Sequence, residues 1–210
     1  APRTARLTPR LAAIASGVLV CGVAIASHHN AYEAIEKGWI AGEVMKVNTP
    51  DGRVGEDNLV RKKMDPAKLA RLSPVFDRKH GTITAATSSA LTDGASCVLV
   101  MSEEKARELG VQPLGYLRSY NFPALDPREN MLLGNVYSVP GALDKAGATL
   151  KDMDLVEIHE AFAAQACAVN KDMGWDPAIV NVNGGAIAIG HPIGASGTRV
   201  LNTLIHEMIR

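Results

Sequence analysis

The amino-acid sequence predicts an α/β fold in which helices pack on a layered β-sheet. From residue 95 onward, segments with strand-like and helix-like patterns alternate up to the C-terminus, which is typical of α/β proteins. Residues 95–101 form a continuous apolar run of strand length, as expected for a strand that is covered on both faces. Aromatic residues make up only 4% while Gly and Ala are abundant, which favours tightly packed α/β layers over a β-sandwich.

Up to about residue 79, the sequence predicts a charged, loop-rich and peripheral region. Ser27 is expected to cap a helix that stops at Gly38. Asp65 followed by Pro66 predicts a second helix start, with a cap and then the first helical position. The elements expected in this region are helices over residues 28–36 and 67–72 and a short strand over residues 43–47.

Strands and helices are expected to alternate through the rest of the chain. The strands are expected at residues 95–101, 113–120, 154–159 and 179–183. The helices are expected at residues 103–109, 140–146, 161–173 and 195–208. Ser102 is the predicted cap of the first of these helices, which has two acids in its first turn. Pro140 is expected to open the second helix, and Gly110 and Gly147 are expected to end the first two.

Residues 1–27 differ in composition from the rest of the chain. Arg3, Arg6 and Arg10 precede a small-apolar run, and no acid occurs before Glu33. The pattern fits a signal peptide with an A-x-A cleavage site, an organelle transit peptide, or ordinary or mis-joined sequence in front of an enzyme. The apolar run is short for a membrane span. We therefore treat this stretch as an atypical N-terminal segment, either targeting-like or mis-joined.

Charge and cysteine content argue against several classes of protein. Lys+Arg and Asp+Glu are balanced at 22 each, and no basic stripe is visible, so no nucleic-acid partner is expected. The three cysteines, Cys21, Cys97 and Cys167, are widely spaced. This spacing argues against a disulfide framework or a zinc site and fits a reducing compartment.

Two loops carry the residues best suited to chemistry, and each is expected at a strand-to-helix junction. The first begins with His159 and Glu160, and the second, residues 181–197, surrounds His191 with five glycines. Such loops gather in the binding crevice of α/β sheets. A histidine held by glycines and stiffened by Pro192 is suited to acid/base or oxyanion work. A plain tight turn is the simpler alternative. A functional site is favoured, because so many glycines around one histidine cost stability and are not expected unless a function compensates for that cost.

These segments resemble the thiolase family. Residues 181–197 (NVNGGAIAIGHPIGASG) and 159–165 (HEAFAAQ) are similar to two thiolase signatures, and residues 81–96 are similar to the segment that closes the N-terminal half. The resemblance runs from about Ser27 to the C-terminus and implies a thiolase-like layered α/β/α/β/α architecture, here incomplete. It also implies that residues 28–110 are the remainder of the N-terminal half, including a loop region, and that residues 111–210 are a truncated C-terminal half.

The resemblance implies roles for particular residues. His191 matches the histidine that activates the nucleophilic cysteine and contributes to an oxyanion hole. His159 stands where many thiolases have an Asn that holds a catalytic water in that hole, and a neutral His can donate one N–H in the same way. Ser89 matches the serine that contacts the pantetheine arm of coenzyme A. Ala161 and Phe162 match the residues that line the pantetheine channel.

Two further features are interpreted through the same resemblance. Glu160 is expected to orient its neighbours and not to act as a base. The basic run Arg61, Lys62 and Lys63 is either a solvated loop or a contact to the phosphates of coenzyme A.

The resemblance also shows what the sequence lacks. Thiolases carry an acyl-accepting cysteine in a C-x-S-G context and an acid/base cysteine in a C-x-G-G-G motif. Cys21, Cys97 and Cys167 stand in neither context. Cys97 and Cys167 are expected to be inert packing residues, mid-strand and mid-helix respectively. We therefore expect a fragment without both catalytic cysteines, which is inactive as given.

The implied activity is that of an acyltransferase in fatty-acid degradation by β-oxidation. It is the thiolytic cleavage of a 3-ketoacyl-CoA to acetyl-CoA and a shortened acyl-CoA, or the reverse Claisen condensation. Coenzyme A and acyl-CoA are then substrates, and no metal or redox cofactor is implied. The expected assembly is a homodimer or homotetramer, with a multifunctional β-oxidation complex as a further partner.

Several alternatives stay open. Residues 114–120 and 126–134 resemble degradative thiolases, whereas residues 166–185 resemble biosynthetic acetoacetyl-CoA thiolases. The main alternative function is a non-catalytic thiolase-like protein that binds acyl-CoA or lipid, or serves as a scaffold. Ketoacyl synthases are a weaker alternative because they lack the two signatures together. The expected location is the cytoplasm, with the mitochondrial matrix as the alternative.

Overall fold

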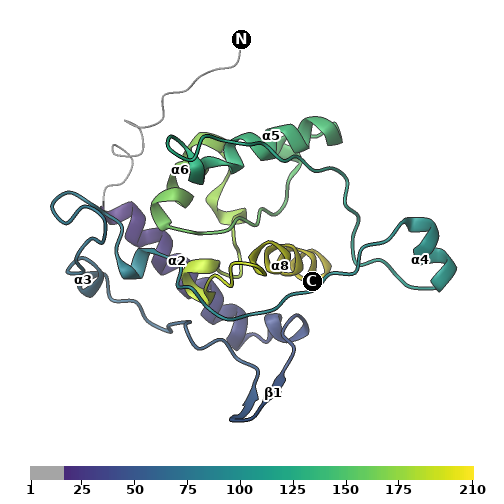
Figure 1. The fold of residues 1–210 in the computed structure, drawn as a ribbon, viewed down its shortest axis with the longest axis horizontal. Coiled ribbons are helices and arrows are strands. Elements are labelled where there is room, and N and C mark those ends of the chain that lie inside the picture. The colour runs from purple at the N-terminus through teal and green to yellow at the C-terminus, as the bar shows by residue number, and fades with distance from the viewer. Residues whose placement is uncertain (1–16) are drawn as a thin grey trace.

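The computed structural model describes residues 17–210 (Figure 1). Residues 1–16, and with them the arginines of the targeting-like segment, lie outside the described residues. The α-helices are α2 (Gly17–Glu36), α3 (Pro66–Leu69), α4 (Glu103–Leu109), α5 (Asn135–Ala146), α6 (Ala163–Met173), α7 (Ala186–Ile189) and α8 (Ser196–Ile209). The strands β1 (Val47–Thr49) and β2 (Gly52–Val54) pair as an antiparallel hairpin. None of the described helices is long and apolar enough to cross a bilayer.

Helix α2 lies at the centre of the molecule and packs against α6 and α7 (Figure 1). Val20 and Ala24 are fully buried and form an apolar cluster with Ala163 and Ile187. The helix begins at Gly17 and not at residue 28, so the predicted boundary at residue 27 falls inside it. The prediction that Ser27 caps this helix is wrong. Ser27 lies in the middle of the helix, and its buried side chain forms hydrogen bonds with Glu160 and Gly185 of the two later loops.

The predicted caps of two short helices are confirmed. The Asp65 carboxylate accepts a hydrogen bond from the Ala67 N–H, and Pro66 is the first residue of α3. The Ser102 hydroxyl accepts from the Lys105 N–H at the start of α4, which ends at Gly110 with φ of 67°. Because such caps satisfy backbone groups that the helix cannot pair internally, they fix helix ends from local sequence alone.

The predicted start of α5 is wrong, whereas its end is confirmed. Pro140 lies inside the helix, which begins at Asn135, directly after the turn Met131–Leu133. Proline is favoured in the first turn of a helix but is not restricted to it. At position 140, inside α5, it leaves the helix without one N–H donor. Gly147 ends the helix with φ of 66°. Helices α6 and α8 lie within two residues of their predicted bounds.

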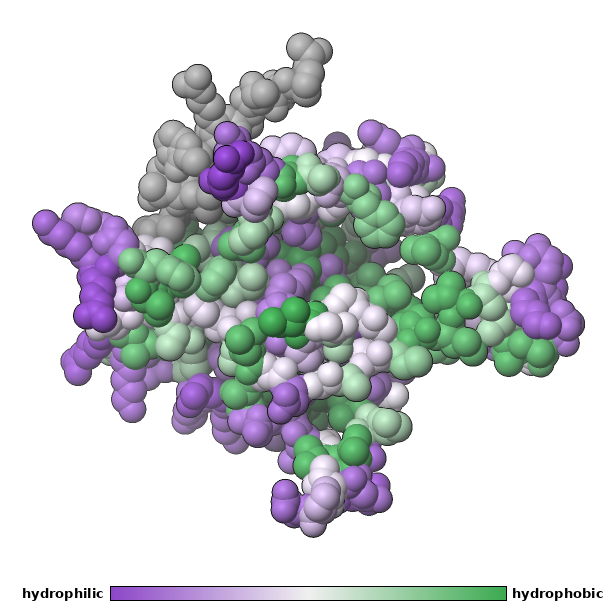
Figure 2. All heavy atoms as spheres, viewed as in Figure 1, coloured by the Kyte–Doolittle hydropathy of each residue, from purple (hydrophilic) through white to green (hydrophobic). Residues whose placement is uncertain are grey.

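The prediction of regular strands at residues 95–101 and 113–120 is wrong. Both segments are extended but unpaired within the described chain, and they form the two sides of a stalk that carries α4 (Figure 1). Leu99 is 81% exposed and Tyr116 is 67% exposed. Figure 2 shows apolar side chains gathered where this stalk meets the rest of the molecule. A strand needs a hydrogen-bonded neighbour, so apolar pattern alone does not produce one.

In place of the last two predicted strands, the structure has a single β-bridge. Residues 154–159 and 179–183 run side by side through a parallel bridge between Val156 and Val180. The Val156 N–H donates to the Ile179 carbonyl and the Asn181 N–H donates to the Val156 carbonyl, each at 2.9 Å. The strand predicted at residues 43–47 is also misplaced, since β1 begins only at Val47. The single bridge nevertheless brings the two following loops together, as the pattern predicted.

The larger apolar cluster packs beside this bridge. It consists of Leu133, Ile158, Ala166, Ala168, Val169 and Trp175. Val23 of α2 packs against both apolar clusters and so links α2 to α6 and α7. The core therefore lies directly beneath the two loops, and it fixes the helices that begin after them.

Candidate active site

The two candidate catalytic histidines are adjacent. The ring centroids of His159 and His191 are 4.0 Å apart, with an angle of 44° between the ring planes. His159 lies four residues before the first residue of α6, and His191 follows α7. The Val156–Val180 bridge lies at the base of both loops. The structure thus brings together the two imidazoles that the sequence singled out.

The backbone of His191 is held by the segment that precedes the stalk. The His191 N–H donates to the Ala90 carbonyl at 2.8 Å, and Leu91 and His191 form a parallel bridge. Gly190 has φ of 92°, and a Cβ there would overlap the Thr92 side chain. Glycine is therefore required at this position both for its backbone conformation and for close packing.

Glu160 connects α2 to both loops. Its Oε2 accepts from the Ser27 hydroxyl at 2.7 Å and from the Ile187 N–H at 3.3 Å, and its Oε1 accepts from the Asn181 amide at 2.8 Å. The residue is 4% exposed. Burial raises the pKa of this carboxyl, and the hydrogen bonds from Asn181 and Ser27 oppose that rise. A carboxylate surrounded by donors organises its neighbours, which is the role predicted from the sequence.

Asn181 fixes the spacing between the two loops. Its side-chain oxygen accepts from the Ile158 N–H at 2.8 Å, and its amide donates to the Ile158 carbonyl at 3.0 Å. Its φ of 48° is positive, which Asn tolerates better than most residues. The sequence showed an Asn in this loop but gave no sign that it pairs with a strand backbone.

His159 is neutral at ordinary pH. Burial, together with the nearby His191 and Arg199, lowers the pKa of His159 to about 4. Both ring nitrogens are buried and have no hydrogen-bond partner within the described chain. A neutral imidazole offers one N–H donor and one lone pair. The ring can therefore bond to a water or to a substrate oxygen.

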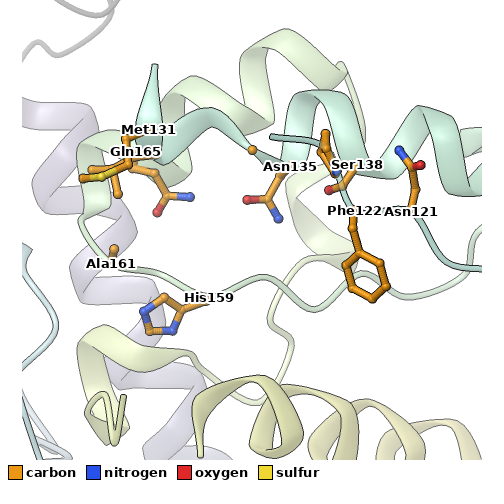
Figure 3. A pocket seen from close by; sticks show the side chains of 11 residues that line it. Asn121, Phe122, Met131, Asn135, Ser138, His159, Ala161 and Gln165 are labelled. Carbon is orange, nitrogen blue, oxygen red and sulfur yellow. The ribbon is translucent and has the colours of Figure 1, made fainter. Parts of the chain in front are cut away.

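A cavity of about 420 Å³ opens beside His159 (Figure 3). His159 and Ala161 lie on one side of it, and Gln165, Asn135 and Ser138 lie on the other. The other lining residues are Asn121, Phe122, Pro123, Met131, Leu132 and Gly134. The lining is thus mostly apolar with a few polar groups, as is typical of small-molecule sites.

The remaining candidate binding residues lie near this cavity but do not line it. The Ser89 N–H and hydroxyl both donate to the Ala161 carbonyl, at 3.0 and 3.1 Å. Phe162 packs edge-on against Phe76, with ring centroids 6.1 Å apart. Of the residues predicted to bind the pantetheine arm, Ala161 alone appears among the lining residues.

Two buried ionisable side chains near His159, those of Glu157 and Arg199, were not predicted from the sequence. Burial raises the pKa of Glu157 to about 8, although the positive charge of Arg199 opposes the rise. Burial likewise lowers the pKa of Arg199. The side-chain polar atoms of both residues are buried without a hydrogen-bond partner in the described part of the chain. Both residues lie just outside the two signature segments, and no local pattern marks them, because a charge in a sequence is normally a surface feature.

The cysteines and the basic run lie in different settings. Cys97 is exposed, so the prediction that it packs in a strand is wrong, because no strand formed by residues 17–210 covers it. The Cys167 thiol is half-buried on α6 and burial raises its pKa, as expected of an inert packing residue.

The basic residues Arg61, Lys62 and Lys63 line a second hollow of about 550 Å³. Among residues 17–210, no group of three or more His, Cys, Asp or Glu side chains is arranged to hold a metal ion.

Comparisons with known proteins give one answer for the whole described chain. The family described as "Thiolase, N-terminal domain" matches residues 20–104, and "Thiolase, C-terminal domain" matches residues 111–210. A 3-ketoacyl-CoA thiolase of Serratia proteamaculans is 48% identical, with 88% of this chain and 47% of the relative covered. One of Yersinia pestis is 46% identical, with 90% and 48% covered. The chain therefore spans about half the length of the curated relatives that it matches.

Solved structures agree with the sequence relatives. The Bacillus anthracis acetyl-CoA acetyltransferase superposes with a TM-score of 0.89 at 36% identity, covering 98% of this chain and 53% of that chain. Human mitochondrial 3-ketoacyl-CoA thiolase in complex with CoA superposes with a TM-score of 0.87 at 34% identity, covering 98% and 52%. The predicted thiolase-like α/β fold, incomplete here, is thereby confirmed. The chain belongs to the thiolase family.

Proposed function

We propose that this chain contributes the histidine pair of a thiolase that cleaves 3-ketoacyl-CoA with coenzyme A, giving acetyl-CoA and a shortened acyl-CoA. The observation that carries the proposal is the 4.0 Å contact between the rings of His159 and His191 beside a mostly apolar cavity. The curated relatives named 3-ketoacyl-CoA thiolase, at 46–48% identity, support the degradative direction. The reverse Claisen condensation uses the same groups.

The chemistry divides a difficult carbon–carbon cleavage into two acyl transfers. In the proposed reaction, a cysteine thiolate of the kind that thiolases carry attacks the 3-keto carbon. The enolate of acetyl-CoA then leaves and takes up a proton. Coenzyme A finally removes the acyl group from the enzyme. No step in this scheme requires a metal ion or a redox cofactor.

The two histidines have different roles in this scheme. His191 accepts the thiol proton and stabilises the thiolate. His159 is neutral, since its pKa is lowered to about 4, so it donates an N–H to the thioester oxygen directly or through a water. Its two unpartnered ring nitrogens support this role, because a ligand or water that bonds to them displaces no existing bond.

The remaining parts of the proposal concern coenzyme A, assembly and location. Human mitochondrial 3-ketoacyl-CoA thiolase was solved in complex with CoA, and we extend CoA binding to this chain, with Ser89, Ala161 and Phe162 along the pantetheine path. We propose an assembly of two or four copies, within or outside a β-oxidation complex. The free cysteines of the described chain and the bacterial relatives support a cytoplasmic location.

The test is a thiolysis assay on the protein as its gene encodes it. Acetoacetyl-CoA and longer 3-ketoacyl-CoAs are incubated with coenzyme A, and acetyl-CoA and the shortened acyl-CoA are quantified. The proposal predicts two acetyl-CoA for each acetoacetyl-CoA consumed, and one acetyl-CoA with one shortened acyl-CoA for each longer 3-ketoacyl-CoA consumed. Tight binding of acyl-CoA with no turnover would instead support the alternative of a non-catalytic acyl-CoA-binding protein.

A further inference from the structure

The hydroxyl of the buried Ser196 contacts the Nδ1 atom of the His191 ring. The distance between His191 Nδ1 and Ser196 Oγ is 2.6 Å. Ser196 is the first residue of α8 and is only 4% exposed. The imidazole is thus hydrogen-bonded at one nitrogen to a group that water does not reach, and nothing in the sequence predicted this contact.

The serine hydroxyl has a second partner, which bears on the direction of the first bond. Ser196 Oγ lies 3.2 Å from the Pro192 carbonyl oxygen, four residues earlier in the chain. A serine in a helix commonly donates its single proton to the carbonyl four residues before it. A carbonyl oxygen has no proton to give, so a hydroxyl that donates to Pro192 can only accept from the imidazole.

We propose that Ser196 is a positioning residue that holds neutral His191 as the Nδ1–H tautomer. The proton chain runs from His191 Nδ1–H to Ser196 Oγ, and from the Ser196 hydroxyl to the Pro192 carbonyl. The lone pair of the ring is then on Nε2. That nitrogen can accept the proton of a thiol, and the resulting imidazolium keeps its Nδ1–H bond to Ser196 throughout.

The surroundings of Ser196 make this arrangement rigid. Its own N–H and that of Ala195 donate to the Pro192 carbonyl, at 2.9 and 2.8 Å. The start of α8 is therefore closed onto the loop that carries His191. A hydrogen-bond partner fixed in this way sets both the tautomer and the orientation of a catalytic histidine. The catalytic meaning of the inference rests on the proposed function, whereas the tautomer itself does not.

The direct test is nitrogen-15 NMR of the histidine rings in the protein as its gene encodes it. The His191 signals are assigned by their loss in His191→Gln. The proposal predicts that in the neutral ring Nδ1 has the shift of a protonated nitrogen and Nε2 that of an unprotonated one. In Ser196→Ala the two tautomers should mix, and Ser196→Thr, which keeps a hydroxyl, should restore the Nδ1–H form. A wild-type ring protonated at Nε2 would overturn the proposal.

Kinetics of the protein as its gene encodes it give a second readout. Ser196→Ala should lower kcat by about 10- to 100-fold with little change in KM, and Ser196→Thr should recover most of the loss. Ser102→Ala, which removes a serine hydrogen bond at the remote start of α4, is the matched control and should leave kcat unchanged.

The two readouts separate failure of this inference from failure of the proposed function. An active wild-type protein in which Ser196→Ala keeps both its kcat and the Nδ1–H tautomer would overturn the positioning role and leave the thiolase function standing. A wild-type protein with no thiolysis would overturn the proposed function, and the NMR result would still decide whether Ser196 sets the tautomer. Preserved amide dispersion in Ser196→Thr guards against misfolding as the cause of any change.

Discussion

Glu160 and Ser27 are joined by a buried hydrogen bond of 2.7 Å between two segments that are far apart in the chain. The bond ties the middle of α2 to the loop that follows His159. The same hydroxyl accepts from the Gly185 N–H at 2.9 Å, which adds the loop before His191. One serine on the central helix thus fixes the relative position of the two loops on which the proposed chemistry depends.

Replacing Glu160 should destabilise the protein. In Glu160→Gln, the amide NH₂ would face at least one donor among Ser27, Asn181 and Ile187. An unsatisfied buried polar group costs about 1–3 kcal/mol. We expect the free energy of unfolding, measured by urea titration, to fall by that amount. An unchanged unfolding midpoint would show that the network does not carry the stability assigned to it.

The close approach of α2 to the glycine-rich loop can be tested with a pair of glycine variants. Gly184 has φ of 78°, and a Cβ there would overlap the Ser27 carbonyl oxygen and the Ala31 side chain. Gly184→Ala should therefore lower the unfolding free energy by about 1–3 kcal/mol through overpacking, in addition to backbone strain. Gly194→Ala is the control, since nothing lies within 4 Å of its added Cβ, and it should be close to neutral by thermal denaturation.

His159 should destabilise the folded state only in acid. Its pKa is lowered from 6.5 to about 4 on folding, so the unfolded chain binds more protons between those two pH values. The free energy of unfolding is therefore not reduced by His159 above pH 6.5, and it decreases as the pH falls from 6.5 towards 4. His159→Asn should flatten that part of the stability–pH curve. Equal slopes for the two proteins, measured by denaturant titration at several pH values, would contradict the assigned pKa.

Variants at His159 distinguish two roles for its ring, that of a hydrogen-bond donor to the oxyanion and that of an acid/base group. Because Asn also offers an N–H donor, His159→Asn should keep measurable thiolysis in the gene-encoded protein. His159→Ala should lose about 10²- to 10³-fold in kcat, as when one oxyanion-hole donor is removed. If the Asn variant were as inactive as the Ala variant, the ring of His159 would have a role beyond hydrogen-bond donation.

The 210-residue chain alone should show no thiolysis of acetoacetyl-CoA. Its three cysteines stand outside the two cysteine contexts that thiolases use, and burial raises the pKa of Cys167, which disfavours its thiolate. The measurement is acetyl-CoA release with coenzyme A present, at enzyme concentrations high enough to detect a single turnover. Sustained turnover would show that a cysteine of this chain acts as the nucleophile.

Apart from the meeting of the two loops, the features that the sequence predicted correctly are local ones. Ser102, Asp65 and the glycines at positions 110 and 147 each satisfy a helix end with atoms a few residues away. Such signals are complete within a short window of sequence. The two histidines were also found in advance, because glycines and a proline around an imidazole are a local pattern.

The features that the sequence could not give depend on distant partners. Residues 95–101 have the composition of a covered strand, but no strand in the described chain pairs with them, and Leu99 stays exposed. Ser27 was misassigned as a cap because its real partners, Glu160 and Gly185, lie far along the chain. Arg199 was missed for the same reason, since the neighbours Glu157 and His159 lie far along the chain. Ser196 was missed although its partners His191 and Pro192 lie only five and four residues away, because the sequence does not show the turn that brings them together.

The measurement that tests the central claim most directly is the turnover of His191→Ala in the gene-encoded protein. With 3-ketoacyl-CoA and coenzyme A as substrates, the loss of the imidazole that lies 4.0 Å from His159 should lower kcat by about 100-fold or more. A variant that retains most of the wild-type kcat would remove His191 from the chemistry and contradict the account.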